Sequence, residues 1–88
     1  MRIWKWTLEL TDVQTIEVPV GAKLLSAQAQ QDAIQLWVLC DENAPKEPRQ
    51  IALYGTGNPM PDDVGEYIST FQMYNGNIVL HAFEIVAH

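Results

Sequence analysis

Apolar side chains recur at every second position through most of this 88-residue chain. The first such run has its apolar residues at Trp4, Trp6, Leu8 and Leu10, with polar residues between them. Successive side chains of a β-strand point to opposite faces, so a period of two predicts a strand with one buried face. We expect at least one of the two tryptophans of this run to lie in the core, since indole rings bury large areas.

Seven runs of this kind are separated by short segments of polar residues, glycine or proline, and they cover residues 4–10, 14–20, 22–31, 34–40, 50–56, 66–73 and 77–86. One stretch is ambiguous: within 22–32, Ala22, Leu25 and Ala29 also lie at helical spacing, although the alternation favours a strand. Seven strands without a convincing helix predict one all-β domain over residues 1–88. Its strands would be mostly antiparallel, in a β-sandwich or a small barrel.

Prolines and glycines indicate where these strands end. Pro19 has no amide hydrogen for a sheet ladder, so its strand should lie at an edge or end there. The prolines of residues 41–49, which read DENAPKEPR, predict a surface loop. The Asn75-Gly76 pair favours the positive φ values of a type I′ turn and predicts a hairpin between the last two strands.

Charge narrows the class of partner. Eleven acidic and five basic residues give a formal net charge of -6, which repels a polyphosphate backbone and argues against direct nucleic-acid binding. The same charge suits a protein partner with a basic surface, although mild acidity also serves solubility. No apolar run is long enough to span a membrane. Cys40 is the only cysteine, so no internal disulfide can form, and we expect a reducing, cytoplasmic setting.

The usual signatures of catalysis and cofactor binding are missing. Gly55-Thr56-Gly57 lacks the further glycine and the Gly-Lys-Ser/Thr run of phosphate-binding loops. Cys40 and His81 have no second Cys or His at zinc-ligand spacing, and a nucleophilic pair of the two would require chance proximity in space. We therefore predict no catalytic residues, no cofactor and no metal, and a protein that is not an enzyme.

The segment YGTGNPMPDDVGEYI, residues 54–68, combines glycines, prolines and three carboxylates. Asp62, Asp63 and Glu66 resemble a cation site in residue type, but they lack the alternate acidic positions of a calcium loop. Asp residues between a proline and a glycine are typical of turns, because their side chains hydrogen-bond the nearby backbone. We predict a rigid connection whose acidic corner is a candidate partner-binding site.

Trp37 is the second candidate. Within its strand it lies on the opposite face from Leu36 and Val38. If that face is exposed, Trp37 beside Leu39 forms an apolar patch that fits either another protein or a second copy of the chain, as a homodimer. Trp37, Asp62, Asp63 and Glu66 together make up the predicted partner-binding residues.

Three segments carry a resemblance that covers nearly the whole chain: LTDVQTIEVPVGAKLLSAQAQ, LWVLCDENAP and, most distinctively, YGTGNPMPDDVGEYISTFQ. In these residues the chain resembles a family of short, functionally uncharacterised proteins of bacteriophages and prophages. The resemblance implies a phage-borne accessory or virion-associated protein and brings no activity or catalytic residues with it.

Two function classes follow from these observations. The first is a non-enzymatic accessory protein in the host cell cytoplasm that binds a host or phage protein, for example to inhibit a host defence complex. The second is a virion-associated or homo-oligomeric structural β-module, for which exposed strand edges provide an assembly mode. A small hydrolase or ligand-binding domain ranks below both.

Overall fold

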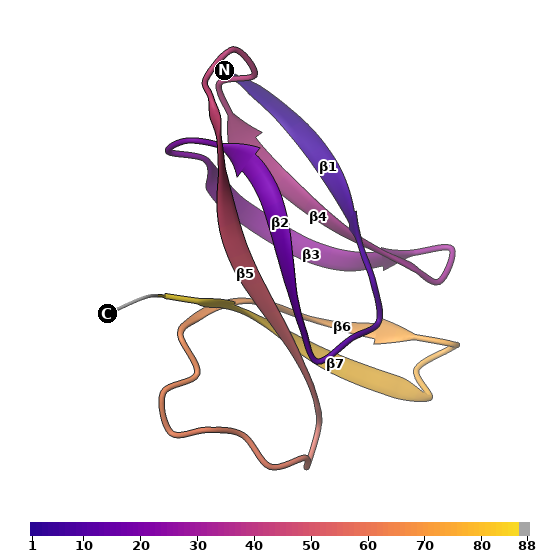
Figure 1. Ribbon diagram of the computed structural model, residues 1–88. Helices are drawn as coiled ribbons and strands as arrows, with labels where there is room; N and C mark the ends of the chain where they lie inside the picture. The colour runs from indigo at the N-terminus through magenta and orange to yellow at the C-terminus, as the bar shows by residue number, and fades with distance from the viewer. Residues whose placement is uncertain (87–88) are drawn as a thin grey trace.

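The computed structural model describes residues 1–86, in which seven strands form two antiparallel sheets and no helix occurs. Sheet A has the strand order β1-β4-β3 and sheet B the order β2-β5-β7-β6, and the two pack as a β-sandwich (Figure 1). The predicted all-β fold is confirmed, and the ambiguous stretch is a strand. The strands are β1 (Arg2–Leu8), β2 (Val13–Pro19), β3 (Lys23–Gln30), β4 (Ala33–Cys40), β5 (Lys46–Gly55), β6 (Glu66–Met73) and β7 (Ile78–Ile85).

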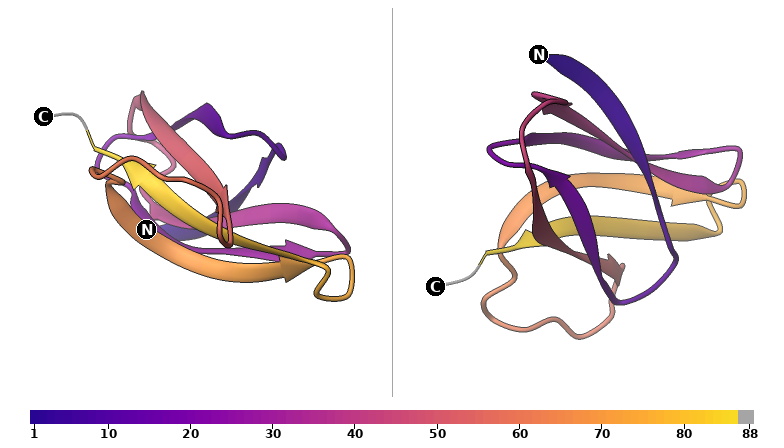
Figure 2. Two further views of the ribbon diagram at one scale, coloured as in Figure 1. Left: turned by 90° about the horizontal axis from the view of Figure 1, so that it is seen from below. Right: turned by 45° about the horizontal axis from the view of Figure 1, so that its top comes forward.

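The core lies between the two sheets and is made by the inward-facing side chains of each strand, whose recurrence at every second residue outside the bulges is the physical origin of the alternation. Its largest fully buried side chains come from β2, β4 and β5: Val18, Leu36, Val38, Cys40 and Ile51. Of the first run, Leu8 is buried, Trp6 packs against the core, and Trp4 remains 49% exposed. Figure 2 shows the two layers from below and in a view tilted so that the top comes forward.

One boundary predicted from prolines is wrong. Residues 46–49 are not loop, because β5 begins at Lys46 and includes Pro48, which lies opposite Glu17 of β2. The pairing of β5 with β7 starts only at Gln50, so at Pro48 the strand has a neighbour on one side only and tolerates a residue without an amide hydrogen. Pro19 behaves as expected: β2 is an edge strand and ends at that residue.

The sandwich is closed along one side by β3 and β6. Each of these strands has a β-bulge, at Leu25 and at Ile68. Beside the second bulge, the Ser69 hydroxyl accepts a hydrogen bond from the Ala27 amide (2.7 Å) and donates one to the Ala27 carbonyl (2.6 Å). A bulge reverses the side on which the following residues point. As a result Tyr67 faces solvent with Thr70, although Phe71 beyond the bulge faces the core.

The predicted hairpin between β6 and β7 is confirmed, but its turn is longer than two residues. The last strand pair joins Met73 and Ile78, and Tyr74, Asn75 and Gly76 all have positive φ. This turn is tied to the β3–β4 turn, because the Tyr74 amide donates to the Asp32 carboxylate (3.1 Å). The two hairpins therefore hold each other at one end of the sandwich.

Candidate functional site

Residues 56–65, which we call the crossover loop, join two strands that are not neighbours. β7 lies between β5 and β6 in sheet B, so the loop must cross β7 on the outer face, since the inner face is filled by the core. Figure 2 shows it passing over β7 in the view from below. At Gly65 the loop touches the strand: an added Cβ would lie 2.0 Å from the Glu84 carbonyl oxygen. Only glycine fits there.

His81 of β7 fastens the start of this loop to β6. Its Nε2 lies 2.7 Å from the Thr56 hydroxyl, and its Nδ1 lies 2.9 Å from the Thr70 hydroxyl. The Thr70 hydroxyl also lies 2.8 Å from the Tyr67 hydroxyl. Both ring nitrogens are engaged by neutral partners, which makes His81 a structural connection between elements far apart in the sequence.

Aromatic rings surround this network on the outer face of sheet B. The Phe83 ring makes edge-on contacts with Tyr54 (centroids 5.9 Å apart) and with Tyr67 (5.5 Å). Tyr67 is 59% exposed although both its ring and its hydroxyl are held. We call Tyr54, Tyr67, His81 and Phe83 the aromatic face. Sequence reasoning did not single out Phe83 or Tyr54, and nothing in the sequence joined His81 to Thr56 or Tyr67.

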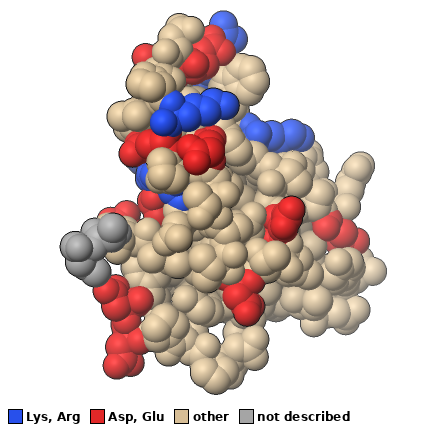
Figure 3. All heavy atoms as spheres, viewed as in Figure 1, with Lys and Arg blue, Asp and Glu red and all other residues tan. Residues whose placement is uncertain are grey.

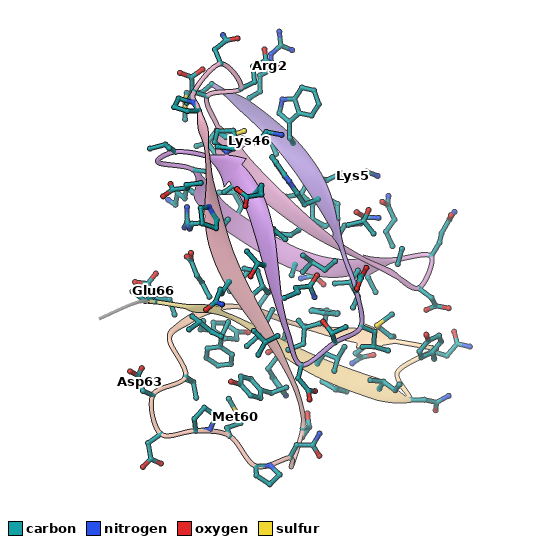
Figure 4. The ribbon with its side chains drawn as sticks, in the orientation of Figure 1. Arg2, Lys5, Lys46, Met60, Asp63 and Glu66 are labelled. Carbon is teal, nitrogen blue, oxygen red and sulfur yellow. The ribbon has the colours of Figure 1, made fainter. Side chains whose placement is uncertain are left out.

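The predicted acidic residues do not form one cluster. Asp62 and Asp63 are exposed on the crossover loop, and Asp63 points away from the sheets (Figure 4). Glu66 is also exposed but begins β6, at the end of the sandwich where Arg49 lies. No Lys or Arg follows Arg49 in the sequence, and on the face drawn in Figure 3 the cations gather in the upper half while the lower half has only acids. The loop and its surroundings are thus negatively charged.

Arg49 and Glu84 form a largely buried ion pair at that end of the sandwich, with side-chain exposures of 20% and 13%. Arg49 bonds both carboxylate oxygens of Glu84 and also donates to the Ala22 carbonyl (2.8 Å). The hydrogen bond to Glu84 raises the pKa of Arg49 against the opposing effect of burial, and the nearby charges of Glu84, Glu47 and Glu66 raise it further. Because its donors are already used within the chain, Arg49 serves the fold.

Two depressions, of about 590 and 290 Å³, flank this ion pair and share Arg49, Glu66 and Glu84 in their walls. Glu66 is the exposed one of the two carboxylates, and in the smaller depression it is accompanied by the exposed Lys23. Among residues 1–86, no group of three or more His, Cys, Asp or Glu side chains is arranged to hold a metal ion. The same residues include no helix that could cross a membrane.

Trp37 lies far from all of these groups. It is half-buried on the outer face of β4, the central strand of sheet A, where its cross-strand neighbours are Lys5 and Ser26. Leu39 and the 61%-exposed Ile3 form the next cross-strand pair on this face. The crossover loop lies on the outer face of the other sheet, where it crosses β7. The four predicted partner-binding residues therefore belong to two separate surfaces, with an apolar, locally basic one around Trp37 and an acidic one around the loop.

The fold and these surfaces define a small two-sheet β-domain with a crossing loop and an exposed aromatic face. The chain belongs to the family described as Domain of unknown function (DUF7352), whose model matches residues 1–88. No curated protein and no solved structure matches it.

Proposed function

We propose that this chain is a phage-encoded, non-enzymatic accessory protein that binds a host or phage protein through the aromatic face and the acids beside it. The observation that carries the proposal is Tyr67, a large, 59%-exposed aromatic side chain fixed by Phe83 and Thr70. The phage setting, in the host cell cytoplasm, rests on the resemblance of residues 54–72. Inhibition of a host defence complex is the specific role we favour.

Rigid, exposed aromatic residues are the side chains that most often dominate protein interfaces. Tyr67 loses little further conformational freedom on binding, because its ring and hydroxyl are already held. The exposed carboxylates of Asp62 and Asp63 on the adjoining loop, without a Lys or Arg after residue 49, favour a partner with a basic surface. The association rate with such a partner should decrease as the salt concentration increases.

The test begins with affinity capture from infected cells and continues with the purified partner. Tyr67→Ala should weaken binding at least about tenfold, as expected for an aromatic anchor. Tyr74→Ala is the matched control, because Tyr74 is a 43%-exposed tyrosine in the β6–β7 turn; it should leave the affinity unchanged. Equal effects of the two substitutions would refute a specific role for the aromatic face.

The loop acids are tested separately by replacing Asp62, Asp63 and Glu66 with their amides. The triple variant should bind more slowly and lose most of the salt dependence of association. Charges at the edge of an interface affect the association rate more than the dissociation rate. Unchanged association rates at low salt would leave the crossover loop with an architectural role only.

A structural β-module is the second candidate, and one observation favours it. The outer face of sheet A leaves Ile3 61% exposed and Trp37 partly exposed beside Leu39, an apolar surface that self-association would cover. Sedimentation velocity across a wide concentration range, together with mass spectrometry of purified virions, tests this role. A monomer that is absent from particles rules it out.

A further inference from the structure

β1 is an edge strand, and its main-chain edge on the side away from β4 is unpaired along its length. It pairs only with β4, and none of its main-chain groups from Arg2 to Leu8 has another hydrogen-bond partner among residues 1–86. The opening ends at Glu9, whose amide and carbonyl are both bound by the Gln14 side chain (2.9 and 2.7 Å). An unpaired edge of this kind is a template for a further strand.

The other edges of the two sheets are obstructed. β3 and β6 close on each other through the hydrogen bonds of Ser69 to Ala27. β2 ends at Pro19, and the Trp6 indole donates to its Glu17 carbonyl (3.1 Å). Among the strands of residues 1–86, only β1 therefore combines an unpaired main chain with exposed side chains on both faces, namely Ile3 (61%) and Trp4 (49%).

Charge distinguishes sheet A from the rest of the molecule. Its three strands contain Arg2, Lys5 and Lys23 and no Asp or Glu, in a chain whose net charge is -6. Arg2 forms an exposed ion pair with Glu42 of the loop between β4 and β5 (2.7 Å). Lys5 has only the neutral Gln30 side chain as a partner (3.2 Å), and Figure 4 shows it projecting outward from β1.

We propose that β1 is a docking edge that accepts an extended segment of another protein, one that alternates apolar and acidic side chains. Such a segment would add a strand to sheet A. Alternate side chains of an added strand point to opposite faces, so its apolar residues would lie beside Trp4 and Trp6 and its carboxylates on the other face, beside Lys5. A second copy of this chain fits less well, because antiparallel pairing of β1 with itself about its middle residue places the two Lys5 side chains opposite one another.

The probe is a capped eight-residue peptide of alternating valine and glutamate, titrated into the ¹⁵N-labelled protein. We expect saturable chemical-shift changes at the amides of Arg2–Leu8, slowed hydrogen exchange on this strand, and a response that weakens with salt. A peptide of alternating valine and lysine has the same backbone pairing capacity with the opposite charge, and it should bind far more weakly.

Lys5→Glu should weaken binding of the glutamate peptide about fivefold, because it exchanges one attraction for one repulsion at an exposed site. Lys23→Glu, at an exposed cation of β3, which β4 separates from β1, is the matched control and should leave the affinity nearly unchanged, as should Tyr67→Ala on the other side of the sandwich. Lys5→Gln, which removes the charge without adding one, should give an intermediate loss.

Three results would overturn the proposal. The first is the absence of saturable shifts on β1 at millimolar peptide, and the second is equal binding of the two peptides or of the Lys5→Glu and Lys23→Glu variants. The third is concentration-dependent protection of the β1 amides in the free protein, which would mean that a second copy occupies the edge.

Discussion

Replacing Gly65 by alanine should destabilise the domain more than any other single substitution in the crossover loop. Two effects add at this position. The residue has φ of 84°, a left-handed conformation that costs a residue with a Cβ about 1–2 kcal/mol. The new methyl group would also lie 2.0 Å from the Glu84 carbonyl oxygen. Since that atom belongs to the backbone of a paired strand, the loop must lift from β7, at a further cost of about 2 kcal/mol.

Gly57 provides a matched control, because it lies in the same loop with the same φ of 84° and has no atom within 4 Å of an added Cβ. Gly57→Ala should therefore cost only about 1 kcal/mol, since the backbone strain is partly offset by the lower entropy of the unfolded chain. Gly65→Ala should cost about 3 kcal/mol in total. For a domain of this size these values correspond to decreases in Tm of about 4–8 °C and about 12–24 °C.

Circular dichroism during thermal and urea unfolding measures both variants. Asparagine separates the two contributions, because it tolerates a positive φ but still has a Cβ. Gly57→Asn should thus be close to neutral, whereas Gly65→Asn should still cost about 2 kcal/mol, which is the contribution of the contact with β7. Equal decreases in Tm for Gly57→Ala and Gly65→Ala would refute the contact between the loop and β7, and with it the role we assign to this glycine.

Three further substitutions probe the closure of the sandwich. Ser69→Ala leaves the buried main chain of Ala27 without its two hydrogen bonds and should cost about 2 kcal/mol, with faster hydrogen exchange at the Ala27 amide. Arg49→Met strands the Glu84 carboxylate and should cost about 2 kcal/mol. Because folding raises the pKa of Arg49, the charged guanidinium stabilises the folded state fully below the pKa of the unfolded chain, and this stabilisation is lost only as the pH rises through the pKa of the folded state. The destabilisation caused by Arg49→Met should therefore be equal at about pH 7 and pH 10 in urea titrations. Trp6→Phe removes the hydrogen bond to β2 and part of the ring that packs against the core, and should cost at least about 1 kcal/mol in the same assay.

Much of the fold was predictable from local patterns. The period of two located all seven strands, and it separated Trp37 from Leu36 and Val38 onto opposite faces of β4, of which the structure buries the one with Leu36 and Val38. Pro19 identified an edge strand. These predictions succeed because burial of one face repeats along a strand whatever its neighbours are. The start of β5 was missed because Pro48 is tolerated only where β7 does not reach, which depends on the neighbouring strand.

The candidate site was less accessible to sequence reasoning. Asp62, Asp63 and Glu66 were noticed as charged residues, but their separation from Trp37 on opposite sides of the sandwich depends on the order of strands in each sheet. The network around His81 joins residues from the loop, β6 and β7. A bulge at Ile68 turned Tyr67 outward, and a bulge has no signature in an alternating pattern.

The sequence by itself determined an all-β domain with defined inner and outer faces, because alternation records burial residue by residue. The tertiary structure alone decided which strands are neighbours, and therefore that residues 56–65 cross β7, that β1 keeps an open edge, and that basic and acidic surfaces lie on different sheets. The reason is physical: strand pairing joins residues far apart in the chain, and the free energy of each pairing depends on the whole set of pairings rather than on any one segment.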